Sequence, residues 1–142
     1  YNSIKPDNLR MNLFDIGAFV NVNKLHLEGE YIYKTYVGRV FPDTKSYSFF
    51  AAYDVWTNKR FLTKITPLLR FDSMTDNNKG KAAAENVYQV DDIARKRLTG
   101  GITISLGKPF LNDIRLNYEK YFYAENIENH DDKLVLEFVV RF

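Results

Sequence analysis

The segment from Lys133 to Phe142 constrains the fold more than any other part of the chain. A large apolar side chain stands at every second position there: Leu134, Leu136, Phe138, Val140 and Phe142. Successive side chains of a β-strand point to opposite faces, so the segment predicts a strand with one wholly apolar face. Glu137 and Arg141 fall on its other face. Such a strand is expected where an apolar phase meets water.

Composition supports an all-β chain of one domain covering residues 1–142. Hydrophobic residues make up 45% of the 142 residues and aromatic residues 15%, chiefly 10 Tyr and 11 Phe, which strands favour. The net charge of +2 is evenly spread, so nucleic acid is not an expected partner. Because the chain has no cysteine, it has neither a disulfide framework nor a thiolate metal site.

The same alternation recurs along the chain and predicts seven strands. They are expected at residues 11–22, 25–36, 46–56, 61–71, 95–106, 110–123 and 133–142. Pro67 weakens the fourth strand, because proline cannot donate to a β-ladder. The Ala-Ala-Ala-Glu run at 82–85 is compatible with a short helix.

The connections between these strands fall into two alternating classes. Short turns are expected near residues 23, 58 and 108, and long polar loops at 38–45, 72–92 and 125–132. Bacterial outer-membrane barrels have short periplasmic turns and longer extracellular loops. No apolar run is long enough for a membrane-spanning helix. The pattern predicts an antiparallel transmembrane β-barrel in the outer membrane of a Gram-negative bacterium, surrounded by lipid. Seven strands do not close in the usual even-numbered pattern, so we expect the C-terminal part of a larger barrel.

Four segments resemble the C-terminal half of phosphate-selective outer-membrane porins, especially those of Bacteroidota. The segments are Leu98–Ile102, Gly107–Pro109, Arg115–Glu119 and Leu136–Phe142. The resemblance implies a pore of about sixteen strands, a homo-oligomer such as a trimer, that passes small solutes including phosphate by diffusion. It also implies that Val140 and Phe142 belong to the signal read by the barrel-assembly machinery. Glu137 stands where that signal usually has a glycine.

The faces expected to line the lumen carry equal numbers of basic and acidic residues. The basic set is Lys34, Lys64, Arg70, Arg95, Arg97, Arg115 and Arg141. The acidic set is Asp15, Glu28, Glu30, Asp54, Asp113, Glu119 and Glu137. Lumen-lining candidates for contact with solutes are Lys64, Arg70, Arg95, Arg97 and Arg115. Rings of basic groups select anions in pores, whereas pairing across neighbouring strands would only stiffen the wall, and the even balance favours pairing.

Catalytic, cofactor and metal signals are weak, and no enzymatic activity or cofactor is expected. His26 and His130 lack the spacing of a zinc site and are expected to be solvated. The run from Asp76 to Gly80 resembles a calcium loop only superficially, because Val87 occupies the position of the bidentate glutamate. The Gly100–Gly101 pair predicts a bend or a close approach.

Aromatic residues near the predicted strand ends are expected to form an interfacial girdle: Tyr31, Tyr33, Tyr118 and Phe122. Two other classes of protein remain compatible with the sequence. A soluble lipocalin-like barrel would bury the apolar faces inside and expose the charged ones. A closed, non-conducting membrane barrel would share the strands but act through its extracellular loops.

Overall fold

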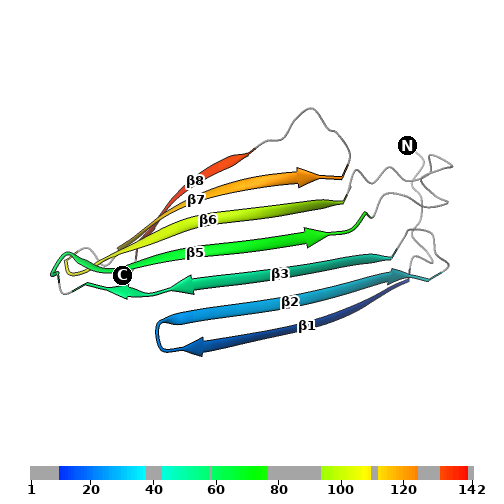
Figure 1. The fold of residues 1–142 in the computed structure, drawn as a ribbon, viewed down its shortest axis with the longest axis horizontal. Helices are drawn as coiled ribbons and strands as arrows, with labels where there is room; N and C mark the ends of the chain where they lie inside the picture. The colour runs from blue at the N-terminus through cyan, green and yellow to red at the C-terminus, as the bar shows by residue number, and fades with distance from the viewer. Residues whose placement is uncertain are drawn as a thin grey trace.

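The structure, a computed structural model, describes residues 10–37, 43–57, 59–76, 94–109, 112–124 and 132–140. These residues form one eight-stranded antiparallel sheet (Figure 1). The strands are β1 (Met11–Val22), β2 (Leu25–Tyr36), β3 (Thr44–Tyr53), β4 (Val55–Trp56), β5 (Leu62–Met74), β6 (Arg95–Leu106), β7 (Asn112–Tyr123) and β8 (Lys133–Val140). The predicted all-β class is confirmed for this part of the chain.

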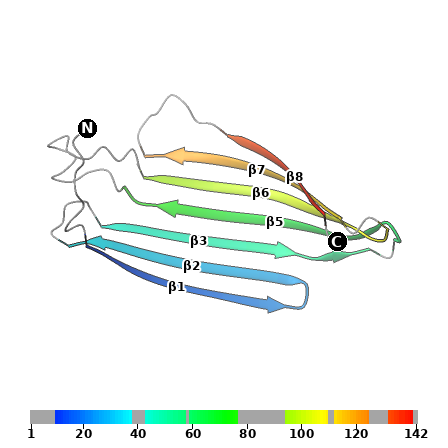
Figure 2. The ribbon, with the colours of Figure 1, turned by 180° about the vertical axis from the view of Figure 1, so that it is seen from behind.

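The strands follow one another across the sheet in chain order, apart from the short β4, which pairs with β5 (Figure 2). Because each strand runs antiparallel to its neighbour, the connections alternate between the two ends of the sheet. The β1–β2, β4–β5 and β6–β7 connections lie at one end, called here the turn end. The longer β2–β3, β5–β6 and β7–β8 connections lie at the other, called the loop end. The predicted alternation of short and long connections is therefore confirmed.

The predicted third strand is wrong in one respect, because it is divided at Asp54 into β3 and β4. Both parts keep the same register against β5, with Ala52 opposite Leu68 and Val55 opposite Ile65. On this register Asp54 lies opposite Thr66, and Tyr53, the last residue of β3, lies opposite Pro67, which has no backbone N–H to give to the ladder. The Asp54 N–H donates to the carbonyl of Lys24, just before β2, at 2.8 Å.

The register sorts the side chains onto two faces as the alternation predicts. One face, called here the apolar face, joins matching apolar residues across the strands, as in the row Leu27, Ala51 and Leu69. The opposite face, called the polar face, carries most of the charged residues of the strands, as in the row Asp72 and Arg97. Three lysines depart from this rule and lie on the apolar face close to the loop end: Lys45, Lys96 and Lys120.

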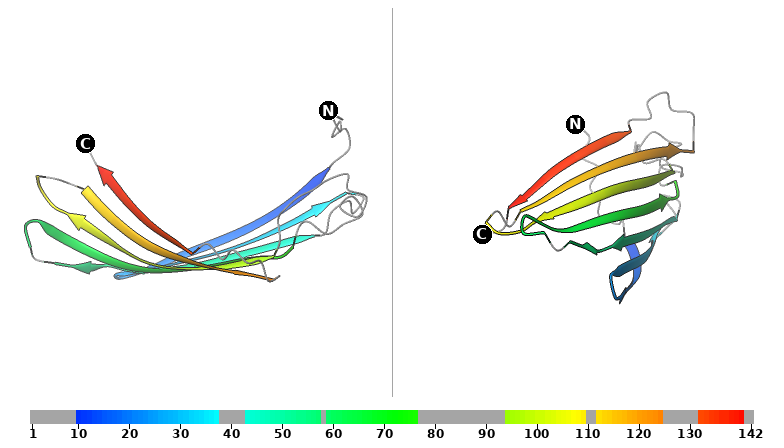
Figure 3. Two further views of the ribbon diagram at one scale, coloured as in Figure 1. Left: turned by 90° about the horizontal axis from the view of Figure 1, so that it is seen from above. Right: turned by 60° about the vertical axis from the view of Figure 1, so that its left-hand side comes forward.

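The sheet is curved, and its edge strands β1 and β8 rise on the same side (Figure 3). Hollows on the polar face reach across β3 and β5 to β8, and polar side chains there are crowded. Asp113 and Thr99 are only 4% and 6% exposed, whereas Leu116 and Leu98, on the apolar face of the same two strands, are 43% and 39% exposed. Side chains crowd on the inside of a curved sheet and spread apart on its outside. The polar face is therefore concave and the apolar face convex.

The sheet is open, with β1 and β8 as its edges, and no large side chain of the described residues is fully buried. No helix among these residues is long and apolar enough to cross a membrane. The predicted positions of the 82–85 helix, His130, Arg141 and Phe142 lie outside the described residues.

Candidate functional site

The five predicted lumen-lining residues all lie on the concave polar face. Lys64 and Arg70 come from β5, Arg95 and Arg97 from β6, and Arg115 from β7. The register fixes this placement. Arg115 lies opposite Thr103 and Arg70 lies opposite Thr99, and these two threonines are on the same face of β6. Val140, which the sequence predicts to belong to an assembly signal, ends β8 on the apolar face and is 53% exposed.

An ion-pair cluster crosses β5, β6 and β7 towards the loop end. Asp72 accepts from Arg70 and from Arg97, each with a shortest N···O distance of 2.9 Å. Arg97 also lies 3.6 Å from Glu119, whose carboxylate accepts a 2.7 Å hydrogen bond from the Tyr121 hydroxyl. The favoured interpretation of the charges, pairing between neighbouring strands, holds for this cluster.

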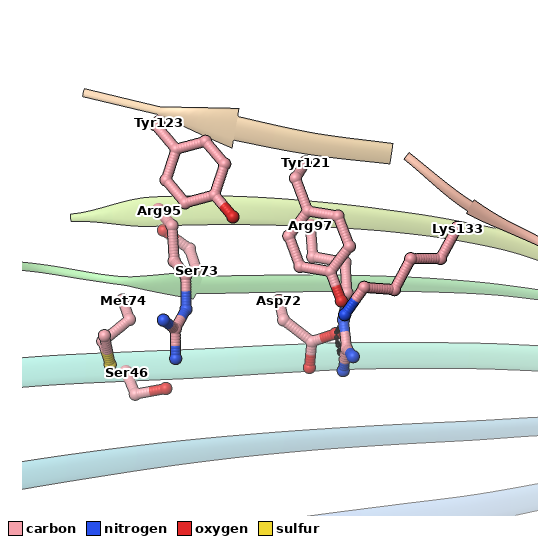
Figure 4. Close-up of a pocket in the computed structure, with 9 residues that line it drawn as sticks. All are labelled: Ser46, Asp72, Ser73, Met74, Arg95, Arg97, Tyr121, Tyr123 and Lys133. Carbon is pink, nitrogen blue, oxygen red and sulfur yellow. Dashed lines mark hydrogen bonds and ion pairs between the residues drawn. The ribbon is translucent and has the colours of Figure 1, made fainter. Parts of the chain in front are cut away.

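The loop end of this cluster opens into a hollow of about 420 Å³, called here the loop-end hollow (Figure 4). Three cationic side chains line it, Arg95 and Arg97 from β6 and Lys133 from β8, together with one carboxylate, Asp72. The rings of Tyr121 and Tyr123 project over the same space from β7 (Figure 4). Charged and aromatic groups thus converge where the strands approach the long connections.

A broader hollow of about 620 Å³ lies nearer the middle of the concave face. Arg115 and Glu137 face each other across β7 and β8, with 3.6 Å between their closest charged atoms. Gly101 lies opposite Asn117, and a Cβ at Gly101 would come within 2.0 Å of the Asn117 side-chain oxygen. The close approach predicted for the glycine pair is therefore confirmed at Gly101. At Gly100 an added Cβ would meet nothing within 4 Å.

A smaller polar cluster lies at the turn end of the concave face. Asp54 accepts from Lys64 at 3.1 Å and from the Thr66 hydroxyl at 2.7 Å. The Lys64 ammonium also lies 5.3 Å from the centre of the Trp56 ring. The interruption at Asp54 thus places a carboxylate beside one of the predicted lumen-lining cations.

His26 makes two side-chain hydrogen bonds rather than facing only solvent as expected. Its ring nitrogens bond Asn21 and Glu28, and its ring lies edge-on to Phe50, with 5.8 Å between the ring centres. No group of three or more histidine, cysteine or acidic residues in the described ranges is arranged to hold a metal ion.

The predicted girdle residues all lie on the convex apolar face towards the loop end, on the separate strands β2 and β7: Tyr31, Tyr33, Tyr118 and Phe122. Two of them turn their hydroxyls towards acids of the connections. Tyr33 donates to Asp43 at 2.9 Å, and Tyr118 donates to Asp132 at 2.5 Å. These tyrosines pair an apolar ring with a polar tip directed towards the loops, as tyrosines at an interface do.

Sequence reasoning missed four residues that line the loop-end hollow: Asp72, Tyr121, Tyr123 and Lys133. Asp72 was assigned to the loop because the fourth strand was expected to end at Phe71, whereas β5 continues to Met74. Asp72 continues the alternation one residue beyond Phe71, but Ser73 and Met74 break it, so the pattern gave no signal that the strand continues to Met74. Lys133 was placed in the last strand, but its neighbours across the sheet depend on the register between β7 and β8.

Comparison with known proteins identifies no relative: the chain matches no family model, no curated protein and no solved structure.

Proposed function

We propose that this chain forms part of the wall of an outer-membrane β-barrel whose water-filled lumen lets small solutes diffuse across the membrane. The observation that carries the proposal is the direction of the curvature. Most charged residues of the strands and the two polar hollows lie on the concave face, and most of the exposed large apolar side chains lie on the convex face. Met11, Leu13 and Phe19 of β1 are exceptions, because they are exposed on the concave face. A transmembrane barrel needs this arrangement, with lipid outside and polar residues inside.

Strand length and the aromatic residues support the same proposal. Most strands have 12 or 13 residues, and about 9–11 suffice for a tilted strand to cross the hydrocarbon core. Tyr33 and Tyr118 lie near the loop end of the convex face, where the Lys120 ammonium also lies 5.7 Å from the centre of the Phe122 ring. Aromatic rings and long cations are the usual residues of membrane interfaces.

The sheet has two unpaired edge strands, β1 and β8, so a closed barrel requires further strands. The unpaired edges of β1 and β8 cannot face hydrocarbon, where backbone groups find no other partner. We therefore propose that further strands, from the same protein, pair with these edges and close the wall. The trimeric state and assembly by the barrel-assembly machinery remain predictions of the resemblance to porins.

Selectivity for phosphate finds less support than general diffusion. Acidic residues neutralise many of the cations on the concave face, as Asp72 does for Arg70 and Arg97. A lipocalin-like barrel is disfavoured because it requires the apolar face to be concave.

Single-channel recording tests the proposal directly. The whole protein that contains this chain is refolded in detergent and added to a planar lipid bilayer. We expect stepwise conductance in potassium chloride, and the heat-denatured protein serves as the control. A barrel that inserts into the bilayer but gives no steps would contradict diffusion and favour a non-conducting membrane protein. Protein that stays soluble without detergent would contradict the membrane assignment itself.

A further inference from the structure

The loop-end hollow combines cations with aromatic rings, and neither the fold nor simple diffusion requires that combination. Arg95, Arg97 and Lys133 bring three positive groups to a space of about 420 Å³ with one lining carboxylate. That carboxylate, Asp72, already accepts from two guanidinium groups. Lys133 has no carboxylate within ion-pair distance among the described residues, so the lining suits an anionic guest.

The two tyrosines beside these cations form an aromatic platform. Tyr121 and Tyr123 stand two residues apart on β7, with ring planes within 14° of parallel and ring centres 6.3 Å apart. Figure 4 shows both rings on the side of the hollow, next to Arg95 and Arg97. Flat aromatic faces bind the faces of ring-shaped ligands, because these also present a flat apolar surface.

The platform is held in place before any guest binds. The Tyr121 hydroxyl donates to Glu119 at 2.7 Å, and the Lys133 ammonium lies 5.3 Å from the Tyr121 ring centre. Arg97 is fixed by Asp72, at 2.9 Å, and by Glu119. The side chains that would contact a ligand therefore lose little further conformational freedom when it binds.

We propose that the loop-end hollow binds a small ring compound that carries a carboxylate, with its ring on Tyr121 and Tyr123 and its carboxylate on Arg95 and Lys133. Guanidinium groups match planar carboxylates with two parallel hydrogen bonds. A hexuronate and an aromatic carboxylate share this chemistry. The inference rests on the proposed function, since the hollow lies on the face assigned to the lumen. There it would act as a selective binding site for solutes that pass through the channel.

Blockade of the single-channel current by a set of small compounds tests the inference. The probes are glucuronate and benzoate, which carry both features, glucose and acetate, which carry one each, and inorganic phosphate. We expect glucuronate, benzoate or both to block at about tenfold lower concentration than glucose, acetate or phosphate, because stacking and ion pairing then act together. The ratio of glucuronate to benzoate blockade distinguishes the two ligand sources.

Variants on β7 and β6 separate the contributions of ring and charge. Tyr123→Ala should weaken the blockade about tenfold, whereas Tyr123→Phe, which keeps the ring, should retain it. Tyr118→Ala is the matched control, because Tyr118 lies on β7 but on the convex face. Arg95→Gln should weaken the blockade by glucuronate or benzoate and leave the blockade by glucose unchanged.

The possible failures are distinguishable. A channel that conducts, but is blocked no better by glucuronate and benzoate than by glucose and acetate, overturns this inference and leaves the proposed function intact. Equal blockade by phosphate that is insensitive to Tyr123→Ala also overturns it. If the protein does not conduct, calorimetric titration of the detergent-solubilised protein with glucuronate and benzoate still tests the inference. Binding that is lost in Tyr123→Ala would support it. Absence of binding would overturn it.

Discussion

Gly107 provides a sharp test of the geometry at the turn end. It follows β6, and its N–H donates to the carbonyl of Phe61 at 2.9 Å. A Cβ added at Gly107 would lie 2.5 Å from the Arg60 carbonyl oxygen and 2.8 Å from the Thr63 side chain. The carbonyl belongs to the backbone and cannot rotate away, so the two segments must separate. The register of β5 against β6 already shifts here, between Leu62 and Lys64.

We expect Gly107→Ala to lower the free energy of unfolding by about 1–3 kcal/mol, the usual cost of forcing extra volume into a packed position. Gly100→Ala is the matched control, because a Cβ there would meet nothing within 4 Å. Replacing glycine within a strand should leave stability unchanged or raise it by about 0.5–1 kcal/mol. The assay is equilibrium unfolding in urea, with the protein in lipid vesicles, followed by far-ultraviolet circular dichroism. Equal stability of the two variants would refute the packing assigned to the turn end.

Three further changes have defined outcomes. Asn23 has a positive φ of 55° in the β1–β2 turn, so Asn23→Val should reduce the free energy of unfolding by about 1–2 kcal/mol while Asn23→Gly does not, as measured by the same urea unfolding. Asp72→Asn removes the carboxylate shared by two guanidinium groups. The reversal potential in a salt gradient should therefore shift towards anion selectivity. A shift towards cation selectivity would contradict the assignment of this face to the lumen. Phe138→Lys places a charge on the convex face and should lower the free energy of unfolding in vesicles by about 2–4 kcal/mol. Val139→Lys, on the concave face, should be tolerated. Similar losses for both variants would be inconsistent with lipid on the convex side only.

Much of the sheet was predictable because its signal is local. The bounds of β1, β2 and β6 agree with the prediction, since most positions of each strand alternate and β1 and β2 flank the Asn23–Lys24 turn. The division of the third strand was not predictable, because Pro67, which lies opposite the last residue of β3, belongs to a different strand. Local alternation cannot reveal which residue a proline will oppose.

The candidate site was predictable only in part for the same reason. Alternation assigned Arg70, Arg95 and Arg97 to one face, and they share it. It could not show that Asp72 lies between two of these cations, because that contact depends on the register between β5 and β6. The platform of Tyr121 and Tyr123 beside Arg95 likewise arises from the pairing of β6 with β7.

The central claim is that the convex face contacts lipid and the concave face contacts water, and cysteine accessibility tests it most directly. The 142 residues contain no cysteine, so single cysteines introduced here can be followed individually. Neighbouring positions on β8 and β7 provide two pairs: Leu136→Cys with Glu137→Cys, and Leu116→Cys with Arg115→Cys. In protein reconstituted in lipid vesicles, a water-soluble maleimide should label the cysteines at 137 and 115 and leave those at 136 and 116 unlabelled. Labelling of 136 and 116 with protection of 137 and 115 would contradict the account.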